Sequence, residues 1–229
     1  MLKNNKKKIA VIIICVAVLT TVILFGTIAF FTSNDTVTNK LTIGNVRINL
    51  TETEYPGNEN SSVTDMLSYS EVEKNPQIQN DGMNESFVFL KVTVPVRDVT
   101  EVGTDGTPGT KKMQEIFYLK NKNDSETDFA NHFNENWVEL PNFETGTDGS
   151  QATRTYVFGY KDAVASGGTT ESLFDKVQLK NIKEELGANQ AQSINVEACA
   201  VQSDYIDVVT DKTNLNTTQL EDIYGLFNS

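Results

Sequence analysis

The sequence predicts an all-β sandwich, and three observations lead to this fold class. Stretches of alternating apolar and polar residues recur at Phe87–Val96, Thr153–Tyr160 and Ile194–Val201. Turn signals rich in Gly, Asp, Asn and Pro separate these stretches from their neighbours. About seven to nine short strands at such spacing are typical of a sandwich. We expect one or two short helices as insertions between the strands.

The other strands are predicted from less regular patterns. They are expected at Lys40–Leu50, with a kink at Gly44, and at Val72–Asn80, Met113–Lys120, Trp137–Leu140 and Val177–Ile182. Pro76 lacks a backbone donor, so the strand around it is expected at a sheet edge or interrupted. Gly and Asp predict hairpin tips at Thr104–Thr110 and Thr145–Ser150.

Two short helices are predicted from capping residues. Asp128 is a candidate N-cap for a short helix that contains Phe129, His132 and Phe133. Thr218 followed by Glu221 has the spacing of a capping box. This second helix lies at the C-terminus, and its apolar residues are Leu220, Ile223, Tyr224 and Leu226.

The N-terminal segment Ile9–Phe31 carries no charge and is long enough to cross a bilayer as a helix. The lysines just before it, at positions 3, 6, 7 and 8, favour export of the chain that follows. Its length favours a retained anchor. Its end favours a signal peptide, because Thr27 and Ala29 place small residues at −3 and −1 of a cut before Phe30. We expect residues 1–29 to be removed.

The exported chain is strongly acidic. Four of the 19 basic residues lie in the removed segment, which leaves 15 basic against 31 acidic residues and a net charge of −16. Such a surface repels nucleic acid and anionic lipid. We therefore expect no nucleic-acid partner, and membrane contact only through the N-terminal segment before cleavage. Cys199 is the only cysteine left, so no intramolecular disulfide is possible, and a small strand residue is expected there.

No catalytic machinery is evident in the sequence. His132 is the only histidine, and neither an H-E-x-x-H zinc motif nor a G-x-S-x-G nucleophile elbow is present. The spacing of Asp204 and Asp207 fits no EF-hand loop, so a solvated turn is expected there. We expect no catalytic residue, no metal ligand and no cofactor.

The segment after the cleavage site is polar but rich in strand-forming residues. Threonine and valine in 30–39 suit an extended strand. An unpaired strand and an unpaired sheet edge each offer backbone groups that need partners. The segment of one subunit can therefore add to the sheet of the next, and head-to-tail repetition produces a filament. A disordered linker, or pairing within the same subunit, is an equally open alternative.

Four blocks of sequence resemble the TasA/camelysin family of Gram-positive bacteria. They are GTIAFFTSNDTVTNKLTIGNVRINLTE (26–52), KNPQIQNDGMNESFVFLKVTVPV (74–96), YVFGYKDAVASGGTTESLFDKVQL (156–179) and INVEACAVQSD (194–204). Their order along the chain is more specific than any one block, and together they cover most of the exported chain.

This resemblance implies a jelly-roll-like sandwich over residues 42–229, with the C-terminal helix. It also implies cleavage next to Ala29 by a SipW-type signal peptidase, and secretion to the cell surface or biofilm matrix. In fibre-forming members the N-terminal segment completes the sheet of a neighbouring copy. Here that donor strand is residues 30–41, with Phe30, Phe31, Val37 and Leu41 as its apolar residues. The main expectation is a secreted fibre subunit that binds copies of itself. The alternatives are a camelysin-type surface metalloprotease and a membrane-anchored monomeric adhesin.

Overall fold

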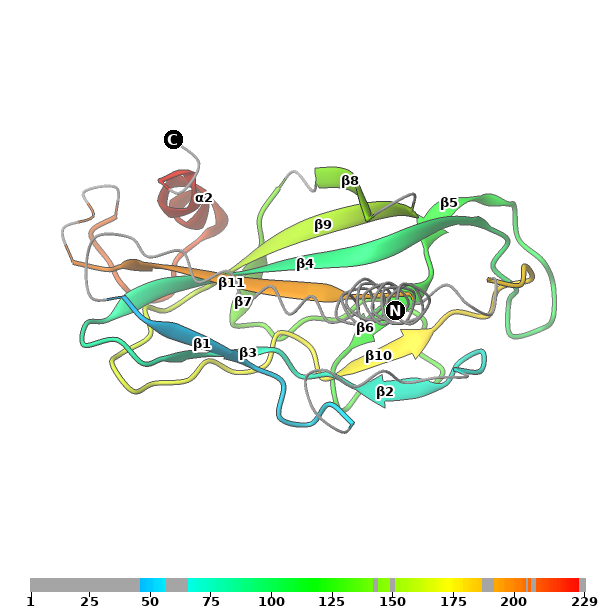
Figure 1. Ribbon diagram of the computed structural model, residues 1–229, viewed down its shortest axis with the longest axis horizontal. Helices are drawn as coiled ribbons and strands as arrows, with labels where there is room; N and C mark the ends of the chain where they lie inside the picture. Colours follow the sequence, from blue (N-terminus) through cyan, green and yellow to red (C-terminus); the bar gives the residue numbers. More distant parts are fainter. Residues whose placement is uncertain are drawn as a thin grey trace, which may run out of the picture. The chain divides into compact units, whose positions relative to one another are not determined.

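The computed structural model describes residues 46–56, 66–141, 144–148, 151–186, 192–204, 206 and 209–226. These residues form antiparallel strands and one helix, which confirms the predicted all-β class (Figure 1). In this described part of the chain, no helix has the length and apolar character needed to span a membrane. The predicted signal segment, Ile9–Phe31, lies outside the described residues.

The largest sheet has six strands, and its central pair is β4 and β9 (Figure 1). The main strand order is β11 (Asn195–Gln202), β4 (Ser86–Val99), β9 (Gln151–Tyr160) and β7 (Trp137–Glu139). In addition, β5 (Lys112–Glu115) pairs with β4, and β8 (Glu144–Asp148) pairs with β9. The three predicted alternating strands are thus β4, β9 and β11, which are neighbours in one sheet.

Two smaller sheets lie against the large one. One has the order β2 (Glu71–Glu73), β10 (Lys176–Leu179) and β6 (Phe117–Lys120), and the other pairs β1 (Ile48–Thr51) with β3 (Gln77–Asn80). Pro76 lies between β2 and β3, so the interruption predicted for Val72–Asn80 is confirmed. The chain passes from one small sheet to the other at this proline.

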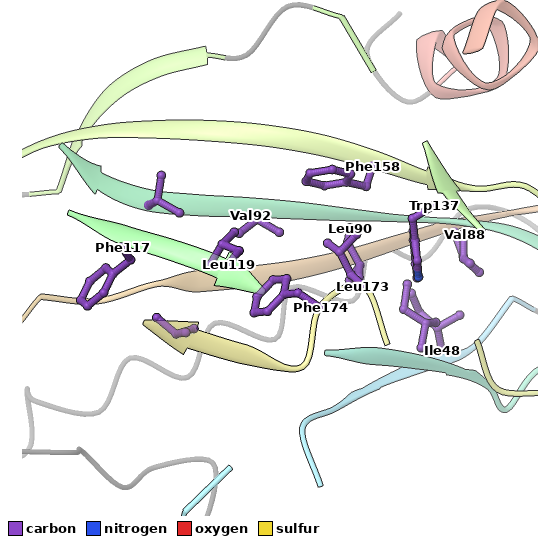
Figure 2. Packing of buried hydrophobic residues seen from close by; sticks show 14 of the residues in the cluster. Ile48, Val88, Leu90, Val92, Phe117, Leu119, Trp137, Phe158, Leu173 and Phe174 are labelled. Carbon is purple, nitrogen blue, oxygen red and sulfur yellow. The ribbon is translucent and has the colours of Figure 1, made fainter. Parts of the chain in front are cut away.

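The main hydrophobic core lies between the large sheet and the two small ones (Figure 2). One face of β4 contributes Val88, Leu90, Val92 and Val94, as the alternation predicted. The facing side chains come from both small sheets and the segment before β10, and they are Ile48, Ile78, Phe117, Leu119, Leu173, Phe174 and Val177. Burial of these side chains holds the layers together.

Helix α2 (Thr217–Gly225) covers part of the opposite face of the large sheet. Leu220 and Ile223 pack there on Phe87 and Phe89 of β4. A Cβ added at Gly159 would lie 3.0 Å from the Leu220 side chain, so a glycine at this position allows the helix to approach the sheet closely. The C-terminal helix was predicted correctly.

The capping box of α2 lies two residues earlier than the sequence suggested. Asn216 is the N-cap, and its side chain accepts a hydrogen bond from the backbone N–H of Gln219. The Gln219 side chain accepts one from the backbone N–H of Asn216 in return. Asparagine caps a helix at least as well as threonine, so the earlier residue is used.

Two predicted strand regions differ from the structure. Met113–Lys120 is two strands that separate at Ile116, because β5 pairs with β4 of the large sheet and β6 pairs with β10 of a small one. The hairpin tip predicted at Thr145–Ser150 is wrong for residues 145–148, because these residues belong to β8, which pairs with β9. All five residues of β8 are exposed and none of them is apolar apart from a glycine, so no apolar alternation was available to predict this strand.

The inserted helix predicted at Asp128–Phe133 is wrong. Asp128 closes a turn by donating its N–H to Ser125 O, and the N–H of His132 donates to Leu119 O of β6. The Phe129 ring packs on the Tyr69 ring, with 4.8 Å between the two ring centroids. These tertiary contacts replace the helical hydrogen bonds that the local sequence favoured.

Candidate functional site

Strand β11 forms one edge of the large sheet. It pairs with β4 along its whole length, from Asn195 opposite Thr93 to Gln202 opposite Ser86. On its other side no described strand pairs with it, although β1 lies nearby. In an antiparallel strand about half of the backbone N–H and C=O groups point to each side. No described strand uses the outward-facing side of β11.

The side chains of β11 make this edge suitable for pairing. Val196 and Ala198 are only partly buried against the main core, and Cys199 and Val201 are partly buried on the other face. Glu197 is the one charged residue in this strand of eight. Natural edges are usually protected by charges, by proline or by being short, and β11 has little of this protection.

The other exposed edges are better protected. Strand β2 has three residues, and two of them are glutamates, Glu71 and Glu73. Strand β7 also has three residues, and β8 carries an acidic residue at each end. Among the described edge strands, β11 is therefore the longest, and it carries one charge in eight residues; β1, which is half as long, carries none. We call the side formed by β11, β1 and β2 the open side.

The opposite side, formed by β6 and β7, is closed by the connection 121–136. The backbone of this connection pairs with β6, because Leu119 accepts from the His132 N–H and donates to the Asn131 side chain at 3.0 Å. Farther along, the Asn134 N–H donates to Leu173 O at 2.9 Å. The two bonds at Leu119 occupy backbone groups of β6 that an incoming strand would otherwise need.

A buried ionic network anchors this connection. The Lys120 side chain is completely buried, and its ammonium lies 2.8 Å from Glu71 Oε1 and 2.8 Å from the carbonyl oxygen of Ser125. Lys176 Nζ contacts the second carboxylate oxygen of Glu71 at 3.1 Å. Gln178 Nε2 donates to the carbonyl oxygen of Glu126. The network thus joins β2, β6 and β10 to the connection that closes the side.

Electrostatics keep the Glu71 carboxylate ionised. Burial by itself raises its pKa, but hydrogen bonds and charge from Lys120 and Lys176 outweigh burial, and the pKa lies below the ordinary value of 4.5. The two ammonium groups compensate for the free energy lost when the Glu71 carboxylate is taken out of water.

Two tyrosine–glutamate pairs lie toward the β4–β5 end of the fold. The Tyr156 hydroxyl donates to Glu115, and Arg154 Nη1 lies 2.9 Å from the same carboxylate oxygen. Burial and this hydrogen bond raise the pKa of Tyr156 to about 12. The Tyr118 hydroxyl donates to Glu101, and burial raises its pKa as well. Both phenols are held protonated and act as hydrogen-bond donors, which is a structural role.

His132 lies between two carboxylates of the closing connection. Its Nδ1 is 3.1 Å from Asp124 and 3.5 Å from Asp128. Within the described residues, no group of three or more His, Cys, Asp and Glu side chains is arranged to hold a metal ion. In this structure His132 helps to order the connection 121–136.

The predicted site residues lie outside the described part of the chain. This applies to the cleavage residues Thr27, Ala29 and Phe30 and to the donor-strand residues Phe31, Val37 and Leu41. Cys199 is in β11, as expected for a strand residue. The sequence alternation located β11 but gave no sign that it is an edge. The pairing of Lys120 with Glu71 was also missed, because 48 other residues separate them in the chain.

Comparison with known proteins returned no match: no family model, no curated protein and no solved structure is significantly similar to this chain.

Proposed function

We propose that the chain is an exported structural subunit in which residues 30–41 of one copy add as a strand to the open side of the next copy. Head-to-tail repetition of this contact gives a fibre at the cell surface or in a biofilm matrix. The observation that carries the proposal is the β11 edge, which is eight residues long and carries one charge. A jelly-roll-like arrangement of the strands is part of this proposal.

The donor segment suits that edge in length and pattern. Phe31, Val37 and Leu41 share one face of an extended strand, because their positions differ by even numbers. A strand of this length extends about 40 Å at roughly 3.3 Å per residue, which exceeds the length of β11. The apolar face would cover the partly buried Val196 and Ala198, and the backbone would satisfy the outward groups of β11.

Export follows from the apolar segment Ile9–Phe31 and the lysines before it. A SipW-type signal peptidase is the proposed processing partner, with cleavage after Ala29. The intact mass of the exported product tests this step. A product that begins at Phe30 supports it, and a product that retains residues 9–29 would favour the membrane-anchored adhesin.

Polymerisation is tested by comparing a chain that begins at Phe30 with one that begins at Thr42. We expect filaments in electron micrographs of the longer chain, and a folded monomer for the shorter one. Within the longer chain, Val37→Asp should prevent filaments, because it places a charge on the face that covers the core. Thr36→Asp is the matched control on the opposite face. Filaments from the chain that begins at Thr42 would contradict strand donation.

A further inference from the structure

The charge on β11 is positioned to select one alignment of an incoming strand. Glu197 is exposed, and it lies opposite Lys91 in the β11–β4 register. The Lys91 ammonium is directed elsewhere, 5.8 Å from the centre of the Tyr224 ring. No ion pair joins Glu197 to another described residue, and its position in β11 places it on the face of the sheet opposite the main core.

The proposed donor segment carries one basic residue, Lys40. In β11 the even-numbered side chains face the main core and the odd-numbered ones face the other side of the sheet. In the donor three of the four apolar residues, Phe31, Val37 and Leu41, have odd numbers, and Phe30 at its start has an even number. When this odd face covers the core, Lys40 emerges on the same side of the sheet as Glu197.

We propose that Lys40 of the incoming strand pairs with Glu197 and thereby sets the register of the contact between copies. This inference rests on the proposed function, since it specifies how residues 30–41 align on β11. A slip by one residue reverses the two faces of the donor, and a slip by two places a threonine opposite Glu197 instead of Lys40. The register with Lys40 opposite Glu197 combines an apolar inner face with opposite charges on the outer face.

Charge reversal tests the pairing in the chain that begins at Phe30. Lys40→Glu and Glu197→Lys each place like charges opposite one another, so we expect each to slow filament growth about tenfold. The double variant Lys40→Glu/Glu197→Lys restores opposite charges and should regain most of the rate. Light scattering gives the rates, and urea unfolding checks that the monomers are equally stable.

The outcomes separate this inference from the function on which it rests. If the unaltered chain forms filaments and both single variants grow at the rate of the unaltered chain, the proposed register is wrong, but strand donation is not contradicted. A double variant that is no faster than the single variants would also overturn it. Absence of filaments from the unaltered chain would overturn both proposals.

Disulfide trapping tests the same register without relying on charge. With Lys40 opposite Glu197, the donor residue opposite Cys199 is Thr38 if the strands are antiparallel and Thr42 if they are parallel. One of the variants Thr38→Cys and Thr42→Cys should therefore give disulfide-linked chains when its filaments are oxidised with diamide. Cross-linking by Thr36→Cys in place of both variants, with Lys40 kept, would place residue 36 opposite Cys199 and contradict the proposal.

Discussion

The two sides of this all-β fold both end in edge strands, but they differ in what lies against those strands. On the closed side, the connection 121–136 pairs with β6 and is anchored on the buried Lys120. On the open side, β11 ends the large sheet with eight residues and one charge. The comparison shows one edge whose backbone groups are bonded within the chain, where polar groups are buried, and one edge with which no described strand pairs.

The largest expected effect is on the closed side. Glu71→Ala leaves the buried Lys120 without its carboxylate, and removing one partner of a buried ion pair costs about 3–5 kcal/mol of unfolding free energy. Urea unfolding of the monomer that begins at Thr42 measures this loss. The control is Glu54→Ala, which removes an exposed pair with Lys122 and should cost less than about 1 kcal/mol. Similar losses for both variants would argue against a special role for the network.

The same carboxylate predicts a pH dependence. The folded-state pKa of Glu71 lies below its ordinary value of 4.5, so its contribution to stability is present above that pH and is lost as the pH falls through the folded-state pKa. Unfolding free energy measured at several pH values should fall less steeply in acid for Glu71→Gln than for the unaltered monomer. Parallel curves for the two proteins would mean that Glu71 does not contribute.

A smaller effect is expected for the closing connection itself. Phe129→Ala removes a partly buried ring that packs on Tyr69 and Tyr118, and we expect a loss of about 2 kcal/mol. Hydrogen exchange at the Leu119 amide, which is bonded to the Asn131 side chain, should become faster. The control Met113→Ala changes an exposed side chain of β5 and should alter stability by less than about 0.5 kcal/mol.

The smallest effect on stability, and the clearest effect on assembly, is expected at the open side. Val196→Lys places a charge on the core-facing side of the β11 edge. Natural sheets use inward-pointing charges on edge strands to prevent pairing with another chain. Monomer stability should fall by about 1 kcal/mol at most, because the long side chain can reach solvent. Filament formation should cease. Val138→Lys replaces a partly buried valine by lysine on β7 of the closed side, on the face that packs with α2, and filaments of that variant should persist.

The sequence predicted those parts of the fold that depend on local pattern. β4, β9 and β11 alternate clearly, Pro76 divides β2 from β3, and the C-terminal helix has its apolar face. The polar β8 gave no such pattern. The helix expected at Asp128 was wrong because its backbone bonds to β6, which only the tertiary structure reveals.

The candidate site was predicted only in part, for a related reason. The donor segment 30–41, which the family resemblance indicated, lies outside the described residues and stays a prediction. The acceptor is defined by strand order, and no short-range pattern in Asn195–Gln202 distinguishes an edge strand from a central one. The Glu71–Lys120 pair joins different strands for the same physical reason: its partners meet only after the sheets form.

The separation of β5 from β6 at Ile116 has a mechanical consequence. One continuous piece of backbone supplies a strand to the large sheet and, directly after it, a strand to a small sheet. Pulling either layer apart therefore places tension on the other through a single residue. Under force, such a subunit should rupture in one step, and an assembly of these subunits would lengthen by whole-subunit increments.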